Sequence, residues 1–114
     1  MPGPVDDAPL REYLRSVAAS GRAVTYAEAA RALGLRPPHT IHRLALALER
    51  TMDADAAAGA PFLAAVVVSR TGTGLPAPGF FERARALGRY DGPDRGAAAA
   101  AFHREELARL YTDQ

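Results

Sequence analysis

The chain of 114 residues contains neither cysteine nor lysine. Without a thiol it can form no disulfide, no thiolate metal site and no cysteine nucleophile, and it has no need of an oxidising compartment. No apolar run approaches the roughly 18 residues that a membrane-spanning helix requires. The N-terminus also lacks the basic-then-apolar pattern of a secretion signal. We therefore expect a cytoplasmic protein with no membrane partner.

The length fits one domain with a modest core. Hydrophobic residues make up 48% of the chain, but many are alanine, so the core must depend on a few large side chains. We expect residues 1–8, which are rich in proline and glycine, to be a flexible leader, and residues 9–114 to form a single domain. The core candidates are Leu14, Val17, Val24, Leu33, Ile41, Leu44, Leu48, Phe62, Val66, Val68, Phe81, Leu87, Phe102, Leu107 and Leu110.

All 14 basic residues are arginine, and the charge is unevenly distributed. Between Ala8 and Met52, seven arginines face three glutamates, a sum of +4, whereas residues 53–114 carry seven arginines and eight acids, a sum of −1. Arginine makes forked contacts with phosphate and guanine. The basic first half is consistent with a nucleic-acid partner, although a GC-rich coding sequence gives the same preference for arginine over lysine.

Helical signals dominate the first half of the chain. Apolar residues recur at helical spacing over residues 9–20, and Gly21 ends that helix. Thr25 followed by Glu28 forms a capping box, in which each side chain satisfies the other residue's backbone amide. This box predicts a short helix over Tyr26–Leu33, which ends at Gly34.

A third helix follows the Pro37-Pro38 turn. Its expected buried face is formed by Ile41, Leu44, Ala45, Leu48 and Met52, with Arg43, Ala47 and Arg50 nearer the opposite face. Two short helices joined by such a turn are typical of a helix-turn-helix.

The β-branched segment Phe62–Arg70 predicts a strand, with Val24 as its pairing partner. The glycine- and proline-rich residues 71–79 predict a loop or hairpin tip with a brief return strand. Two more helices are expected over residues 80–87 and 97–111. The predicted fold class is therefore α+β, a small winged helix-turn-helix domain with two additional C-terminal helices.

In a DNA reader of this class, the N-terminal residues of the second helix face the base edges in the major groove. Here those residues are His39, Thr40, His42 and Arg43, preceded by Arg36. Arg43 is suited to the two acceptors of guanine, and Thr40 to a phosphate or a thymine methyl group.

The loop after the expected strand supplies a second set of candidate contacts. Arg70, Thr71 and Thr73 would touch phosphates from the wing. We therefore expect a DNA-binding protein that is not an enzyme.

The segment "GRAVTYAEAARALGLRPPHTIHRLALAL", residues 21–48, resembles the helix-turn-helix half of the alkylguanine-DNA alkyltransferases and alkyltransferase-like proteins. The shared run is T-Y-x-E-x-A-x-x-L-G, and the resemblance covers about a quarter of the chain. It implies that Tyr26 lies against the DNA backbone. It also implies that His42 or Arg43 stands where the family places an intercalating arginine.

The active-site motif of that family, Pro-Cys-His-Arg, has no counterpart here. The corresponding region reads "FLAAVVVSRTGTG", with neither a cysteine nor a proline-histidine pair. Alkyl transfer needs a thiolate acceptor. The sequence therefore excludes transferase activity, and the resemblance supports the fold more than the function.

The main alternative is a protein-interaction module, an adaptor or inhibitor, with Leu75, Pro76 and Phe80 as exposed anchors. Convergence of Arg22, Arg36, Arg43 and Arg70 on one face would favour DNA, and scattered arginines beside an exposed apolar patch would favour a protein.

Three further expectations concern metals, charges and assembly. His39 and His42 would need a third ligand, His103 or Glu49, to bind a metal, so we expect no metal and no cofactor. The charged residues of the last helix, Arg104, Glu105, Glu106 and Arg109, predict a solvated face. The two C-terminal helices are candidates for packing against a second copy in a homodimer.

Overall fold

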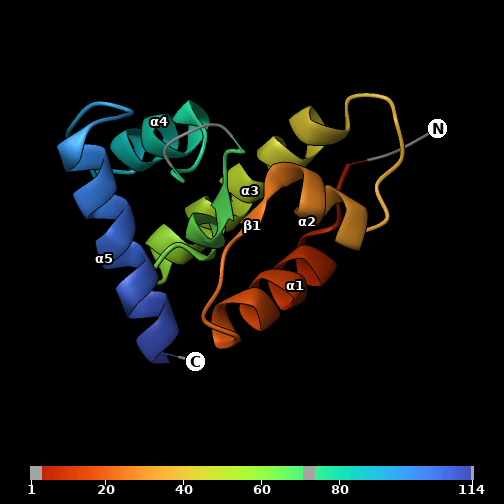
Figure 1. Ribbon diagram of the computed structural model, residues 1–114, viewed down its shortest axis with the longest axis horizontal. Helices are drawn as coiled ribbons and strands as arrows, with labels where there is room; N and C mark the ends of the chain where they lie inside the picture. The colour runs from red at the N-terminus through yellow and green to blue at the C-terminus, as the bar shows by residue number, and fades with distance from the viewer. Residues whose placement is uncertain (1–3, 71–73, 114) are drawn as a thin grey trace.

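The computed structural model describes residues 4–70 and 74–113. These residues form five α-helices, one 3-10 helix and a two-stranded parallel sheet, an α+β arrangement that is mostly helical (Figure 1). The elements are α1 (Asp7–Ala19), β1 (Val24–Thr25), α2 (Tyr26–Ala32), α3 (Thr40–Ala57), η1 (Leu63–Val66), β2 (Val67–Val68), α4 (Pro78–Ala86) and α5 (Ala97–Asp113).

The segment η1–β2 runs through the middle of the molecule. Figure 1 shows α1 and α2 on one side of it and α4 and α5 on the other. Helices α1, α3 and α5 all pack against η1, and every residue of Pro61–Val67 is buried. The core is therefore built around this segment.

Helix α1 buries Leu10, Leu14 and Val17 on one face, as their helical spacing predicts. Val5, just before the helix, is also buried, and its carbonyl accepts a hydrogen bond of 2.7 Å from Arg50 of α3. The packed part of the chain thus begins before the expected boundary at Pro9.

The predicted pairing of Val24 with the second-half strand is confirmed. Val24 pairs with Val67 and Thr25 with Val68, in parallel. Within the described residues the sheet contains only these two strands, so the expected return strand after the loop is not found in residues 74–77.

The prediction of a strand over the whole of Phe62–Arg70 was wrong. Leu63–Val66 is a 3-10 helix, and only Val67 and Val68 are in the sheet. An apolar run that is buried on every side has no alternating pattern, so periodicity cannot distinguish a strand from a buried helical turn. Buried side chains, described below, hydrogen-bond the backbone here in place of a neighbouring strand.

The predicted buried face of α3 was wrong at two positions. Ile41 is 47% exposed, whereas Ala47, expected nearer the outer face, is fully buried. The face that packs on the core is rotated, because α3 contacts α1 and η1 as well as α2 and α4. It consists of Leu44, Ala47, Leu48, Thr51, Met52 and Asp55.

The predicted solvated face of α5 was wrong at Glu106, which is 3% exposed. Its Oε1 atom accepts hydrogen bonds from the Phe62 amide (2.9 Å) and from the Arg89 guanidinium (2.8 Å). Burial of a carboxylate is tolerated when it is paired and hydrogen-bonded in this way. Such partners are distant in sequence, so helical spacing alone does not reveal them.

Candidate functional site

Helices α2 and α3 and the turn between them form the candidate unit. The predicted capping box is confirmed: the Glu28 amide donates to Thr25 Oγ1 (3.1 Å), and the Thr25 amide donates to Glu28 Oε1 (2.8 Å). Gly34 follows α2 with φ = 69°, a left-handed conformation that glycine adopts without strain. The chain then turns through Pro37-Pro38 into α3.

Arg43 belongs to the internal structure of this turn. Its Nε donates to the Pro38 carbonyl (3.1 Å), and its guanidinium also donates to the Arg36 carbonyl. The side chain is half-buried. In this arrangement Arg43 fixes the approach to α3 through hydrogen bonds from Nε and Nη2 to the backbone.

The other candidates around the start of α3 lie at the surface. Arg36, His39 and His42 are exposed, and Thr40 is half-buried. His39 itself has φ = 56° at the position just before the helix. Arg31, near the end of α2, is exposed on the same helix–turn–helix unit, although the sequence analysis did not single it out.

This unit contains no acidic residue between positions 29 and 48, while it carries Arg31, Arg36, Arg43 and two histidines. Within the described ranges, neither Arg31 nor Arg36 forms an ion pair with a carboxylate. Several arginines elsewhere are neutralised instead: those paired to acids are Arg11, Arg50, Arg83, Arg85, Arg89 and Arg109. Of the seven arginines between Ala8 and Met52, Arg15, Arg22, Arg31 and Arg36 form no salt bridge within the described residues, and two of these four lie on the α2–α3 unit.

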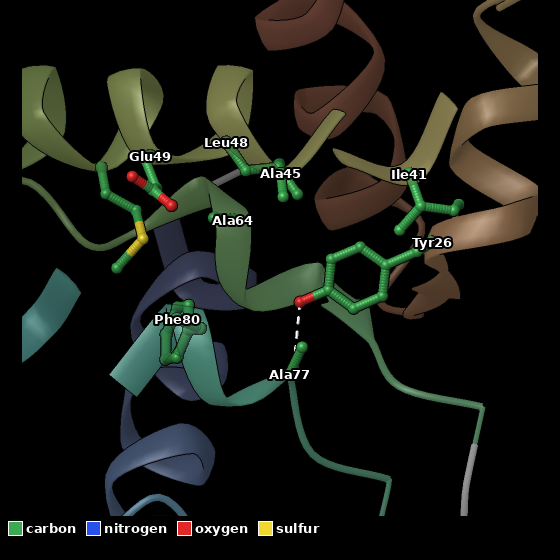
Figure 2. Close-up of a pocket in the computed structure, with 10 residues that line it drawn as sticks. Tyr26, Ile41, Ala45, Leu48, Glu49, Ala64, Ala77 and Phe80 are labelled. Atoms are coloured by element: carbon green, nitrogen blue, oxygen red, sulfur yellow. Dashed lines mark hydrogen bonds between the residues drawn. The ribbon is translucent and has the colours of Figure 1, made fainter. Parts of the chain in front are cut away.

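Tyr26 points inward rather than to the surface (Figure 2). Its hydroxyl accepts a hydrogen bond of 2.9 Å from the Ala77 amide. Burial raises the pKa of this phenol above its ordinary value, an effect only partly opposed by the amide. The residue therefore ties the first turn of α2 to the start of α4.

The loop before α4 is anchored at both ends beside α2. The Ser69 amide donates to the Leu75 carbonyl (2.7 Å), and Ala77 is held by Tyr26. Arg70 is exposed on this loop. Thr71 and Thr73, the other two wing candidates, lie outside the described residues.

The expected convergence of four arginines is incomplete. The Arg22 carbonyl accepts a hydrogen bond from the Tyr111 hydroxyl (3.1 Å), which places Arg22 beside the last turns of α5. Arg36 and Arg43 lie together at the α2–α3 turn, because the carbonyl of one binds the side chain of the other. Arg22 is therefore not part of the basic surface of the turn.

The anchors proposed for a protein partner were wrong. Leu75 and Phe80 are 8% and 6% exposed, and Pro76 is buried. Phe80 packs edge-on against Phe62 and Phe81, so its ring belongs to the core. The pair Phe80 and Phe81 therefore fixes the preceding loop to the core. Composition alone does not show whether such a pair packs inside the protein or is exposed to a partner.

An apolar groove lies between α3 and α4, with a cavity volume of about 160 Å³. Figure 2 shows Tyr26 and Ile41 near one end, Ala45, Leu48 and Ala64 along the middle, and Glu49 and Phe80 near the other end. The lining residues of α3 are Ile41, Ala45, Leu48, Glu49 and Met52. The four apolar residues of this set were predicted from their spacing, but they were assigned wholly to the core, and Glu49 was not part of that prediction.

Sequence reasoning missed a buried polar network beneath these surfaces. Asp55 accepts hydrogen bonds from the Leu63 amide (3.0 Å) and from Arg11 (2.9 Å). His103 Nε2 donates to the Ala65 carbonyl (2.8 Å), so the ring carries its proton on Nε2. Burial lowers the pKa of His103, because desolvation outweighs this hydrogen bond. Together with Glu106, these side chains satisfy the backbone of the central segment.

No group of three or more histidine, aspartate or glutamate side chains within residues 4–70 and 74–113 is placed to hold a metal ion. None of the helices in these ranges is long and apolar enough to cross a membrane. Comparison of the chain with known protein families, curated proteins and solved structures finds no match to any of them.

Proposed function

We propose that this protein binds duplex DNA through the α2–α3 unit, on a scaffold of the winged-helix type in which the loop of residues 69–77 acts as the wing. The observation that carries the proposal is the acid-free stretch of residues 29–48, where Arg31 and Arg36 are exposed and form no salt bridge within the described residues. Arg31 interacts electrostatically with Glu28, which precedes this stretch. Duplex DNA presents a dense row of phosphates, and uncompensated arginines are the groups that displace its counterions.

In this proposal the residues divide into two roles. The exposed side chains at the start of α3, His39 and His42, face the major groove, whereas Arg31 and Arg36 contact phosphates on either side. Arg43 positions the turn and does not read a base, since its donors already bind two carbonyls. This assignment differs from the one predicted from the sequence, in which Arg43 was the base-reading residue.

The order of the elements supports the scaffold. Helices α1, α2 and α3 precede strand β2, and the following loop returns to the side of α2 through the Ala77–Tyr26 hydrogen bond. In a winged helix the wing also lies beside the helix-turn-helix unit, where it reaches the neighbouring backbone of the DNA. Arg70, exposed at the base of the loop, is the described residue suited to that contact.

The test is fluorescence anisotropy of a labelled mixed-sequence duplex, titrated with protein at several salt concentrations. We expect the logarithm of the affinity to fall linearly with the logarithm of the salt concentration. Arg31→Ala and Arg36→Ala should each weaken binding and reduce the salt slope by about one, as the loss of one phosphate contact does. Both residues are exposed, so circular dichroism should report an unchanged fold.

Arg104→Ala is the matched control, because Arg104 is an exposed arginine on α5, on the opposite side of the molecule from α2 (Figure 1). The Arg104→Ala variant should bind DNA with the same affinity and the same salt slope as the unmodified protein. Absence of binding at low salt, or an equal loss in the Arg104 variant, would overturn the proposal.

A further inference from the structure

The groove between α3 and α4 is suited to a single side chain. Its volume of about 160 Å³ is below the roughly 300–1,000 Å³ that is typical of sites for small ligands. Its walls are mostly apolar, and one of the residues that line it, Ile41, is 47% exposed. Apolar surface that continues out of a small pocket is typical of a site where a partner protein inserts an anchor residue.

The charges at the end of the groove near Phe80 are acidic. Glu49 lines the groove there, and an adjoining hollow is lined by Glu49, Glu82 and Arg83. Arg83 is neutralised by Asp53, which accepts two hydrogen bonds from it (2.8 and 2.6 Å). The same arginine also forms a longer ion pair with Glu49, at 3.8 Å.

Arg83 is thus shared between Asp53 and Glu49, and with Glu82 the three carboxylates outnumber this one arginine, so this end of the groove keeps a net negative charge. Such a surface repels nucleic acid and attracts a basic side chain. The charge thus selects a protein occupant over DNA for this face of α3.

We propose that the α3–α4 groove binds a segment of a partner protein in which a leucine-sized apolar residue is followed or preceded by an arginine or lysine. The apolar side chain fills the cavity between Ala45, Ala64 and Phe80, and the basic group binds the carboxylate of Glu49. The inference is independent of DNA binding, since it uses the α4 side of α3 and not the exposed arginines of the turn.

The test is selection of short random peptides, displayed on phage, against the immobilised full chain. The enriched peptides should share an apolar residue beside an arginine or lysine. Synthetic versions should bind the Ala45→Leu protein at least about tenfold more weakly, because the added side chain occupies the cavity as an anchor residue would. Glu49→Gln should abolish the preference for the basic residue while the apolar preference remains.

Two controls separate a filled groove from a damaged fold. Ala108→Leu makes the same change at an exposed position of α5 and should leave peptide binding unaltered. The Ala45→Leu protein should unfold at the same temperature as the unmodified protein or higher, since filling a cavity adds contacts. No enrichment, enriched peptides without the apolar–basic pair, or equal binding by the Ala45→Leu protein would overturn the inference.

Discussion

Replacement of Glu106 should expose how strongly the fold depends on one buried carboxylate. The side chain is 4% exposed, and it joins α5 to two distant segments through the Phe62 amide and the Arg89 guanidinium. Arg89 also lies over the Phe62 ring at 4.1 Å and donates to the Ala60 carbonyl (2.9 Å). Glu106→Ala therefore leaves a buried amide without an acceptor and a guanidinium without its counter-charge.

The magnitude follows from these two losses. Removing one partner of a buried ion pair costs about 3–5 kcal/mol. An unsatisfied buried donor costs about 1–3 kcal/mol, but the two costs overlap and are not added in full. We expect Glu106→Ala to lower the free energy of unfolding by about 4 kcal/mol. Glu106→Gln retains an acceptor for the Phe62 amide and should lose less, about 2 kcal/mol.

Urea denaturation followed by circular dichroism measures both changes. Arg109→Ala is the control, because Arg109 approaches Glu106 at 3.3 Å but is 50% exposed. Such a surface pair contributes at most about 1 kcal/mol. A loss of stability in Glu106→Ala no larger than in Arg109→Ala would show that the buried carboxylate contributes little to the fold. Equal losses in Glu106→Ala and Glu106→Gln would show that the hydrogen bond to the Phe62 amide contributes little.

Two further predictions concern stability. Because burial lowers the pKa of His103, the unfolded chain binds a proton more readily than the folded one, and the free energy of unfolding should fall as the pH drops below about 6.5. Urea denaturation at pH 7.5 and 5.5 measures this fall in the free energy of unfolding. His103→Gln can still donate a hydrogen bond to the Ala65 carbonyl and should show a smaller pH dependence. The same pH dependence in the variant would show that His103 is not the group responsible. Thr25→Ala removes the acceptor for the Glu28 amide and should lower the free energy of unfolding by about 1 kcal/mol, a fall of about 4 °C in melting temperature. Thr25→Ser keeps a hydroxyl acceptor and should retain most of the stability. Equal melting temperatures for the two variants would refute the role of the cap.

Local signals in the sequence predicted the first half of the fold well. The capping box at Thr25 and the glycine at position 34 depend on backbone geometry within a few residues, and both are found as expected. The pairing of Val24 with the second-half strand was also predicted correctly, because few other β-branched segments exist in the chain.

Features that depend on distant contacts were not predictable in the same way. Which residues of α3 face the core depends on how α1, α2, η1 and α4 pack around it, so Ile41 and Ala47 were assigned to the wrong faces. The 3-10 turn at Leu63–Val66 depends on side chains of α3 and α5 that satisfy its backbone. No pattern within residues 62–70 contains that information.

Of the candidate residues, the surface position of His39 and His42 was predictable from the sequence, whereas the contacts of Tyr26 and Arg43 were not. Both histidines are exposed at the start of α3. The inward roles of Tyr26 and Arg43 arise from hydrogen bonds to Ala77, Pro38 and Arg36. Those partners are visible only once the turn and the loop have been positioned in space.

The central segment takes its hydrogen-bond partners from both α3 and α5, and this has a consequence for synthesis of the protein. A nascent chain that still lacks α5 has neither the imidazole for the Ala65 carbonyl nor the carboxylate for the Phe62 amide. The central segment therefore gains its full set of side-chain partners only after α5 has been synthesised and has packed against it. Before that step, water must satisfy the Phe62 amide and the Ala65 carbonyl, and the Phe80 ring lacks its contact with Phe102 of α5.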